Sequence, residues 1–206
     1  MVAVRKYFLA MGGLALLFIL LNGLRGDRGI AVEGIGLAPA RSMTTRYDVY
    51  FRKFTRTYFG RVSWKWFKAQ AIQESLLEPR ARSRVGAMGL MQIMPATFQE
   101  IRREIGLLDT PWDPRTNIKA GIYYNLKCYR AWNERRSETD KLLLMFASYN
   151  AGTGNIVRAQ KVVRDRMVCS GRTWACVQKG LPAVTGRHSE ETILYVDRIQ
   201  RYHDLL

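Results

Sequence analysis

Residues 64–97 have the sequence WKWFKAQAIQESLLEPRARSRVGAMGLMQIMPAT. On a helical wheel, Trp64, Phe67, Ala71 and Glu74 fall within an arc of about 80°. This spacing predicts an amphipathic helix whose last turn places a carboxylate on the face that apolar side chains bury. A carboxylate is unusual on a buried apolar face, and we therefore interpret Glu74 as a residue that performs acid chemistry.

A loop rich in glycine and methionine follows this predicted helix. Pro79 ends any helix, and the run after it is Gly86-Ala87-Met88-Gly89-Leu90-Met91-Gln92-Ile93-Met94-Pro95. Glycines allow backbone conformations and close approaches that a Cβ forbids. We therefore expect this segment to fold tightly against a ligand and to form part of the cleft around Glu74.

Apolar residues at spacings of three and four predict six further helices. Their expected inner faces are Tyr47, Tyr50, Phe51, Phe54 and Tyr58; Phe98, Ile101 and Ile105; Ile118, Ile122, Leu126 and Tyr129; the continuous run 142–147; Ile156, Val163 and Met167; and Thr192, Tyr195, Ile199 and Tyr202. No stretch alternates with a period of two for long enough to predict a sheet. The sequence therefore predicts one mainly α-helical domain over residues 44–206.

The N-terminus predicts an envelope location. Arg5 and Lys6 precede an apolar run over 7–24, and about 18 apolar residues is the lower limit for a helix that spans a bilayer. We predict that residues 1–25 form an uncleaved membrane anchor, with a cleaved signal peptide as the alternative. Residues 26–43, rich in Gly, Ala and Pro, are expected to form a linker. The domain would then lie in the periplasm.

The charge balance favours a polyanionic partner. The chain has 33 Lys and Arg against 17 Asp and Glu, a net charge of +16. Nucleic acid, an anionic membrane surface and a wall polymer that bears carboxylates would all fit this charge. Because the basic residues are dispersed and the domain is predicted to be exported, we expect no nucleic-acid partner.

The cysteines predict one disulfide and no metal site. Cys169 and Cys176 are close enough in sequence to close a small loop, whereas Cys128 lies in a helical pattern and is expected to be a buried thiol. With two histidines and no CxxC pair, the sequence offers no plausible set of zinc ligands. We expect neither a metal nor a cofactor.

Five segments in register resemble a known family. They are Glu74-Ser75, the run 86–95, Asp113-Pro114 with Asn117-Ile118 and Gly121, Ala147-Ser148-Tyr149-Asn150-Ala151-Gly152, and Glu191-Thr192 with Tyr195-Val196. In this order they are similar to the catalytic domain of soluble lytic transglycosylases, in the glycoside hydrolase family 23 that also holds goose-type lysozymes. The resemblance implies a lysozyme-like α fold and cleavage of the β-1,4 bond between N-acetylmuramic acid and N-acetylglucosamine in peptidoglycan.

The resemblance also implies roles for single residues. Glu74 would be the catalytic acid, and the hydroxyl of Tyr195 would orient or stabilise it. The expected substrate-binding residues are Ser75, placed beside Glu74, together with Met91, Gln92, Tyr149 and Asn150.

The sequence offers one convincing catalytic carboxylate, although most glycosidases use two. Glu78 directly precedes Pro79, and Asp113 matches a family position that looks structural. A single carboxylate suffices if the N-acetyl group of the substrate assists and the 6-hydroxyl of the sugar then attacks, which gives a 1,6-anhydro product. Glu74 would act first as an acid and then as a base.

Two other functions remain open at this stage. A hydrolytic lysozyme on the same fold differs only in its product. The chain is also compatible with a weakly active, wall-remodelling component of an envelope-spanning secretion, conjugation or phage-entry machine.

Overall fold

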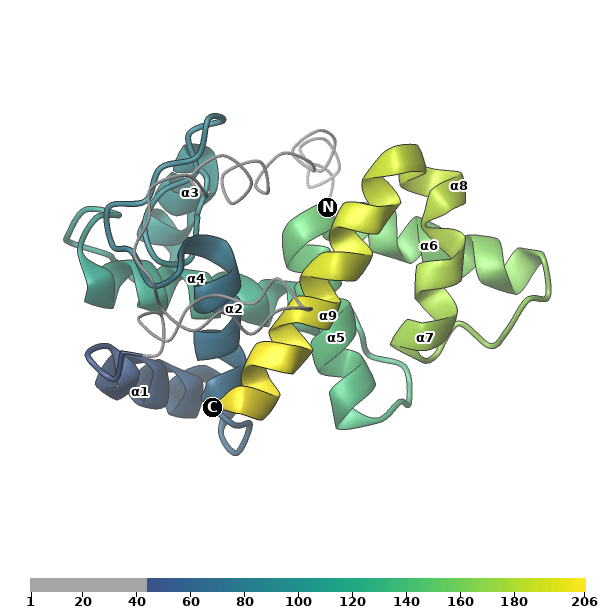
Figure 1. Cartoon of the computed structure of the whole chain (residues 1–206), viewed down its shortest axis with the longest axis horizontal. Helices are drawn as coiled ribbons and strands as arrows, with labels where there is room; N and C mark the ends of the chain where they lie inside the picture. The colour runs from purple at the N-terminus through teal and green to yellow at the C-terminus, as the bar shows by residue number, and fades with distance from the viewer. Residues whose placement is uncertain (1–43) are drawn as a thin grey trace, which may run out of the picture. The chain divides into compact units, whose positions relative to one another are not determined.

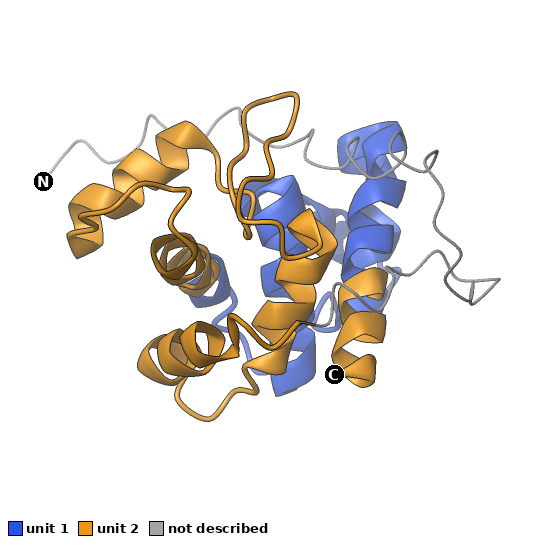
Figure 2. Ribbon diagram, turned by 60° about the vertical axis from the view of Figure 1, so that its left-hand side comes forward, with its two compact units in different colours: residues 1–13, 128–196 blue, residues 14–127, 197–206 orange. Residues whose placement is uncertain are grey.

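The computed structural model describes residues 44–206, so the predicted anchor (1–25) and linker (26–43) lie outside the described residues. The described chain divides into two compact units (Figure 2). Unit 1 comprises residues 128–196, and unit 2 comprises residues 44–127 with 197–206. The division falls within two helices, α4 (Pro114–Arg130) and α9 (Ser189–Leu205).

Unit 2 contains the helices nearest the N-terminus of the described chain (Figure 1). They are α1 (Asp48–Phe59), α2 (Lys65–Ser75), α3 (Pro95–Ile105), most of α4 and the end of α9. Their buried apolar side chains include Phe51, Phe54, Phe67, Ile72, Phe98, Ile101, Ile118 and Ile122. The buried residues of α1, α3 and α4 largely follow the periodic stripes predicted for these segments.

The predicted helix before Glu74 exists, but it is not amphipathic. Every residue of α2 from Phe67 to Gln73 is buried, including Lys68, whose Nζ lies 2.7 Å from Oδ1 of Asp48. The helix also ends before Pro79 is reached, because Leu76 and Leu77 adopt the left-handed conformation with φ of 55° and 60°. The end of α2 is therefore surrounded by core on most sides.

Polar contacts attach α4 to α2 and α3. Asn125 donates a hydrogen bond of 2.6 Å to the side-chain oxygen of Gln70, and it is Asn125, not the predicted Leu126, that completes the buried face of α4. The ammonium group of Lys127 lies 2.5 Å from Glu100 and 2.7 Å from Glu104 on α3. Burial opposes the charge of Lys127, but its hydrogen bonds with the two carboxylates raise its pKa on balance.

Unit 1 is built around α5 (Glu138–Ala151), which is buried continuously from Leu142 to Ser148, as the apolar run predicts. Ser137 caps this helix by accepting a hydrogen bond of 3.0 Å from the backbone N–H of Asp140. The other elements are α6 (Thr153–Asp165), α7 (Trp174–Val177), α8 (Pro182–Thr185), the start of α9, and short 3-10 helices at Gln178–Gly180 and Gly186–His188.

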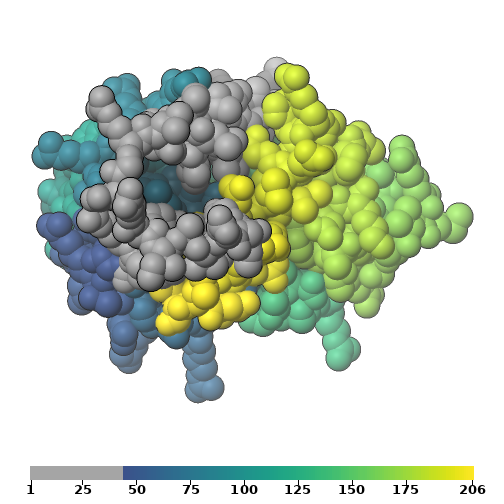
Figure 3. Space-filling view, viewed as in Figure 1, coloured from purple at the N-terminus to yellow at the C-terminus, as the bar shows by residue number. Residues whose placement is uncertain are grey.

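The predicted inner face of α6 is correct at Ile156 and Val163 and wrong at Met167. The helix ends at Asp165, and Met167, with φ of 51°, is 91% exposed. Periodicity extended the helix by two residues too many. Figure 3 shows the segment after α6 as a projection at the surface.

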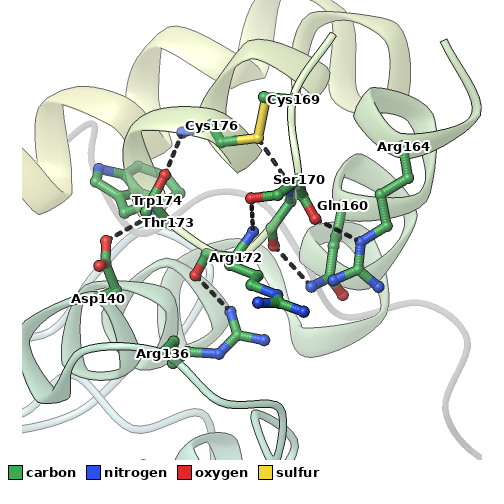
Figure 4. The surroundings of a disulfide bond; sticks show 11 residues. Arg136, Asp140, Gln160, Arg164, Cys169, Ser170, Arg172, Thr173, Trp174 and Cys176 are labelled. Atoms are coloured by element: carbon green, nitrogen blue, oxygen red, sulfur yellow. Dashed lines mark hydrogen bonds between the residues drawn. A yellow bond between two sulfur atoms is a disulfide. The ribbon is translucent and has the colours of Figure 1, made fainter. Parts of the chain in front are cut away.

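The predicted disulfide between Cys169 and Cys176 is confirmed, with Cα atoms 6.0 Å apart, and Cys128 is buried as predicted. Three side chains donate hydrogen bonds to consecutive carbonyls of the enclosed loop (Figure 4). They are Arg164 to Ser170 at 2.9 Å, Gln160 to Gly171 at 2.8 Å and Arg136 to Arg172 at 3.0 Å. The disulfide loop is thus held by side chains as well as by its covalent bond.

The mainly α-helical prediction is confirmed for the described chain. Residues 44–206 contain no β-strand, and two isolated bridges join Met88 to Arg82 and to Ile93. Among these residues, no helix combines the length and apolar character needed to cross a membrane.

Candidate active site

Glu74 lies in the last turn of α2, at the point where this helix leaves the core of unit 2. Its side chain is half-buried. The residues before it are packed on all sides of the helix, and the left-handed turn at Leu76 begins directly after Ser75. The fold thus gives this carboxylate a fixed backbone position at the edge of a core.

Ser75 joins the end of α2 to the glycine-rich loop. Its hydroxyl donates a hydrogen bond of 2.8 Å to the carbonyl oxygen of Leu90, and the carbonyl oxygen of Ala71 lies at 3.3 Å. The residue next to Glu74 and the centre of the loop are therefore held together, as expected for a loop that flanks Glu74.

The loop is closed by its own hydrogen bonds. The carbonyl oxygen of Ala81 accepts from the backbone N–H of Gly89 at 2.9 Å and from the side-chain amide of Gln92 at 3.0 Å. The same amide also donates to the carbonyl of Gly89 at 2.9 Å. Gln92 is 7% exposed, and Met91 is fully buried. The side chain of Gln92 and the backbone N–H of Met91 hold the loop, and the saccharide contacts of both residues stay a prediction.

Asn117 attaches the loop to α4. Its side-chain oxygen accepts from the backbone N–H of Met91 at 2.7 Å, and its amide nitrogen donates to the carbonyls of Met88 at 3.0 Å and Pro111 at 2.8 Å. A Cβ on Gly89 would lie 2.4 Å from that amide nitrogen. A glycine is needed here because the loop approaches a protein side chain, which the sequence interpretation, directed at a ligand, missed.

The two other acidic candidates have local structural roles. Oδ1 of Asp113 accepts a hydrogen bond of 2.8 Å from the backbone N–H of Thr116 and so caps α4. Glu78 is exposed, and its Oε1 accepts from the backbone N–H of Arg80 at 3.0 Å. In the described part of the chain, no three His, Cys, Asp or Glu side chains gather in a way that would hold a metal ion.

Unit 1 carries the remaining predicted residues. Tyr149 and Asn150 lie in the last turn of α5 and are half-buried. Oδ1 of Asn150 accepts a hydrogen bond of 2.8 Å from the hydroxyl of Thr192, one turn before Tyr195, which is 1% exposed. Unit 1 thus connects the end of α5 to α9. Because Tyr195 and Glu74 belong to different units, their hydrogen bond stays a prediction.

Residues 53–167 match the family described as the transglycosylase SLT domain. The chain belongs to this family.

Several named members of the family are similar to this chain. The membrane-bound lytic murein transglycosylase F of Pseudoalteromonas translucida is 29% identical over 172 residues, which are 78% of this chain and 34% of that protein. The protein of the same name from Desulfosudis oleivorans is 30% identical over 154 residues, 69% of this chain and 33% of that protein. The chain thus spans about a third of the length of the curated relatives it matches.

Solved structures of family members have the same fold. The 70 kDa soluble lytic transglycosylase of Escherichia coli matches with a TM-score of 0.56 and 30% identity, over 76% of this chain and 23% of that one. An inactive mutant of the lytic transglycosylase Slt of Pseudomonas aeruginosa matches with a TM-score of 0.61 and 26% identity, over 78% of this chain and 24% of that one. These similarities confirm the predicted lysozyme-like helical fold of the family.

Proposed function

We propose that this SLT chain is a lytic transglycosylase that cleaves the β-1,4 bond between N-acetylmuramic acid and N-acetylglucosamine in peptidoglycan. The observation that carries the proposal is the position of Glu74, at the end of a helix buried on all sides and tied through Ser75 to the glycine-rich loop. The names of the relatives, which are lytic transglycosylases, support the same reaction.

In the proposed mechanism, Glu74 supplies and then recovers one proton. Its carboxylic acid donates the proton to the glycosidic oxygen as the bond from that oxygen to C1 of the muramic acid breaks. The N-acetyl group of the same sugar stabilises the positive charge that develops at C1. The 6-hydroxyl then forms a bond with C1 and gives its proton to the Glu74 carboxylate, which leaves a 1,6-anhydromuramoyl end. No water is consumed.

The roles of the other carboxylates support this one-carboxylate mechanism. Asp113 caps α4 through its bond with Thr116, and Glu78 accepts a backbone N–H in an exposed turn. In the proposed mechanism no second carboxylate acts at the reacting bond, and the N-acetyl group of the substrate assists instead.

Three residues of unit 1 have proposed roles in the reaction. We propose that Tyr149 and Asn150 bind saccharide and that the Tyr195 hydroxyl orients Glu74, as the family resemblance implies. The bond from Thr192 fixes the amide of Asn150 and supports its role. For Met91 and Gln92, burial supports a main role in holding the loop.

We further propose that residues 1–25 anchor the enzyme in the cytoplasmic membrane, with the catalytic domain in the periplasm. The two transglycosylase F relatives are named membrane-bound, which supports this location, whereas the Escherichia coli relative is named soluble.

The product of the reaction tests the proposal. Purified full-length chain is incubated with peptidoglycan, and the released fragments are analysed by mass spectrometry. Anhydromuramoyl ends are expected. Reducing ends alone would make the chain a hydrolytic lysozyme, and very slow release would favour a weakly active wall-remodelling component.

A further inference from the structure

Three arginines alternate with buried residues in the segment that connects α2 to the glycine-rich loop. Arg80, Arg82 and Arg84 are exposed, whereas the residues between them, Ala81 and Ser83, are buried. The bridge between Arg82 and Met88 marks the extended part of this segment, and Arg80 and Arg84 lie in the hydrogen-bonded turns 78–81 and 83–86 on either side of it. We refer to Arg80, Arg82 and Arg84 as the arginine row.

The backbone of the row is fixed by the buried residues Ala81 and Ser83, which lie between its members. The carbonyl of Ala81 accepts from Gly89 and Gln92, as described above. The hydroxyl of Ser83 accepts from the backbone N–H of Ala87 at 2.9 Å, and the Ser83 N–H donates to the Ala87 carbonyl at 3.0 Å. The loop that holds the row also accepts the hydrogen bond of Ser75. A chain of hydrogen bonds within unit 2 therefore connects the row to the residue next to Glu74.

The charge of the row is not compensated within the described chain. Other cations form ion pairs: Lys127 pairs with Glu100 and Glu104, and Arg164 pairs with Glu134 and lowers the pKa of that carboxyl. Among residues 44–206, none of the ion pairs involves a member of the arginine row.

Glu78 is the acidic residue nearest to the row in sequence, and its Oε1 accepts a backbone N–H, that of Arg80. Three arginines less one glutamate leave a charge of +2 on this short segment. Such a fixed cluster attracts an anionic ligand.

We infer that the arginine row binds the carboxylates of the peptide stems that peptidoglycan chains carry. The inference rests on the proposed function and adds to it a preference for chains whose stems are charged. The planar guanidinium group matches a carboxylate in a two-bond arrangement. A stem peptide bears several carboxylates along an extended backbone, which suits a row of cations better than the uncharged hydroxyl and acetamido groups of the sugars do.

The test compares one glycan in two charge states. Soluble, uncrosslinked chains are used either with native stems or with the stem carboxylates converted to amides. Three full-length proteins are compared: the wild type, the row variant Arg80→Gln/Arg82→Gln/Arg84→Gln, and the control variant Arg56→Gln/Arg61→Gln/Arg103→Gln. The control removes the same charge from exposed arginines elsewhere in unit 2.

We expect the wild type to have about a tenfold higher kcat/KM on native chains than on amidated ones, mainly through KM, because each exposed ion pair contributes up to about fivefold. The row variant should lose this preference while keeping its rate on amidated chains, and the control variant should keep the preference. Added salt should weaken the preference of the wild type, because salt screens exposed charges.

Two results would overturn the inference. In the first, the row variant would keep the wild-type preference for native chains. In the second, it would lose rate equally on both substrates, which would mean that the arginines support the fold. Co-sedimentation with both substrates is measured in parallel. If the wild type cleaves neither substrate, the proposed function fails, and row-dependent binding to native over amidated chains still decides the inference.

Discussion

The hydroxyl of Ser75 donates a hydrogen bond of 2.8 Å to the carbonyl oxygen of Leu90, fifteen positions later in the chain. This contact joins the end of the helix that carries Glu74 to the middle of the glycine-rich loop. Ser75 was predicted among the substrate-binding residues, and its observed contacts are with backbone carbonyls. We now regard it as a positioning residue.

Ser75→Ala should therefore lower kcat by about tenfold and leave KM nearly unchanged, because a displaced acid costs rate more than binding. The loss of one part-buried hydrogen bond should reduce the free energy of unfolding by about 1 kcal/mol. Steady-state kinetics on soluble glycan chains and urea unfolding measure the two effects. Ser63→Ala, at an exposed serine of the same unit, is the control. A rise in KM with unchanged kcat would restore the substrate-binding role.

Gly89→Ala should reduce the free energy of unfolding by more than the strain of the Gly89 backbone conformation alone. Gly89 has φ of 74°, and its Cβ would lie 2.4 Å from the amide nitrogen of Asn117 and 2.7 Å from the carbonyl oxygen of Pro111. Gly106, directly after α3, is left-handed with a similar φ of 61° and has no atom within 4 Å of its Cβ, so Gly106→Ala is the matched control.

We expect Gly106→Ala to reduce the free energy of unfolding by about 1 kcal/mol, the strain of a left-handed residue. Gly89→Ala should reduce it by about 3 kcal/mol or more, because overpacking adds to that strain. Equal losses in urea unfolding would mean that the contact with Asn117 is not tight.

Removal of the disulfide should destabilise the chain. Chain entropy for the short loop between Cys169 and Cys176, seven positions apart, predicts a loss of about 2.5 kcal/mol. The double variant Cys169→Ser/Cys176→Ser and the wild type in reductant should unfold at the same, lower urea concentration. The intact oxidised protein should be lighter than the reduced form by two hydrogen atoms. Identical stability with and without reductant would argue against the bond.

Tyr195→Phe tests the role that the family resemblance implies for this hydroxyl. The substitution keeps the buried ring on α9 and removes one donor, so kcat should fall by about 10² if the donor acts in the transition state. Tyr202→Phe removes a hydroxyl from another buried tyrosine of the same helix and should leave kcat unchanged. If both variants turn over like the wild type, Tyr195 is a packing residue.

Most helices were predictable because burial repeats with the helical period. The stripe Thr192, Tyr195, Ile199 and Tyr202 on α9 is buried throughout. The helices between 174 and 188 were not predicted, because elements of three or four residues are too short to show a period. Met167 was misplaced for a related reason: periodicity does not mark the residue at which a helix stops.

The general position of the candidate site around Glu74 was predictable from the sequence, but the contacts that hold its residues were not. The motif residues located Glu74 at the end of a helix and the loop next to it. The bond between Asn117 and Met91 joins residues 26 positions apart, and no periodic pattern reports such a pair. The complete burial of α2 also escaped prediction, because Lys68 and Gln70 look like solvent-exposed residues until Asp48 and Asn125 are seen as their partners.

The central claim is that Glu74 alone donates and then accepts the proton in a reaction that consumes no water. One of the solved relatives is an inactive mutant in which a glutamate is replaced by glutamine, and Glu74→Gln makes the same exchange here. Glu78→Gln removes an exposed carboxylate four positions away and is the control.

The decisive measurement is mass spectrometry of the fragments that these three proteins release from peptidoglycan. The wild type and Glu78→Gln should release chains with 1,6-anhydromuramoyl ends, lighter by one water than reducing ends. Glu74→Gln should keep the fold and the binding of glycan, while release falls by several orders of magnitude, because the acid and base roles are lost together. Wild-type release by Glu74→Gln, or reducing ends alone from the wild type, would contradict the mechanism.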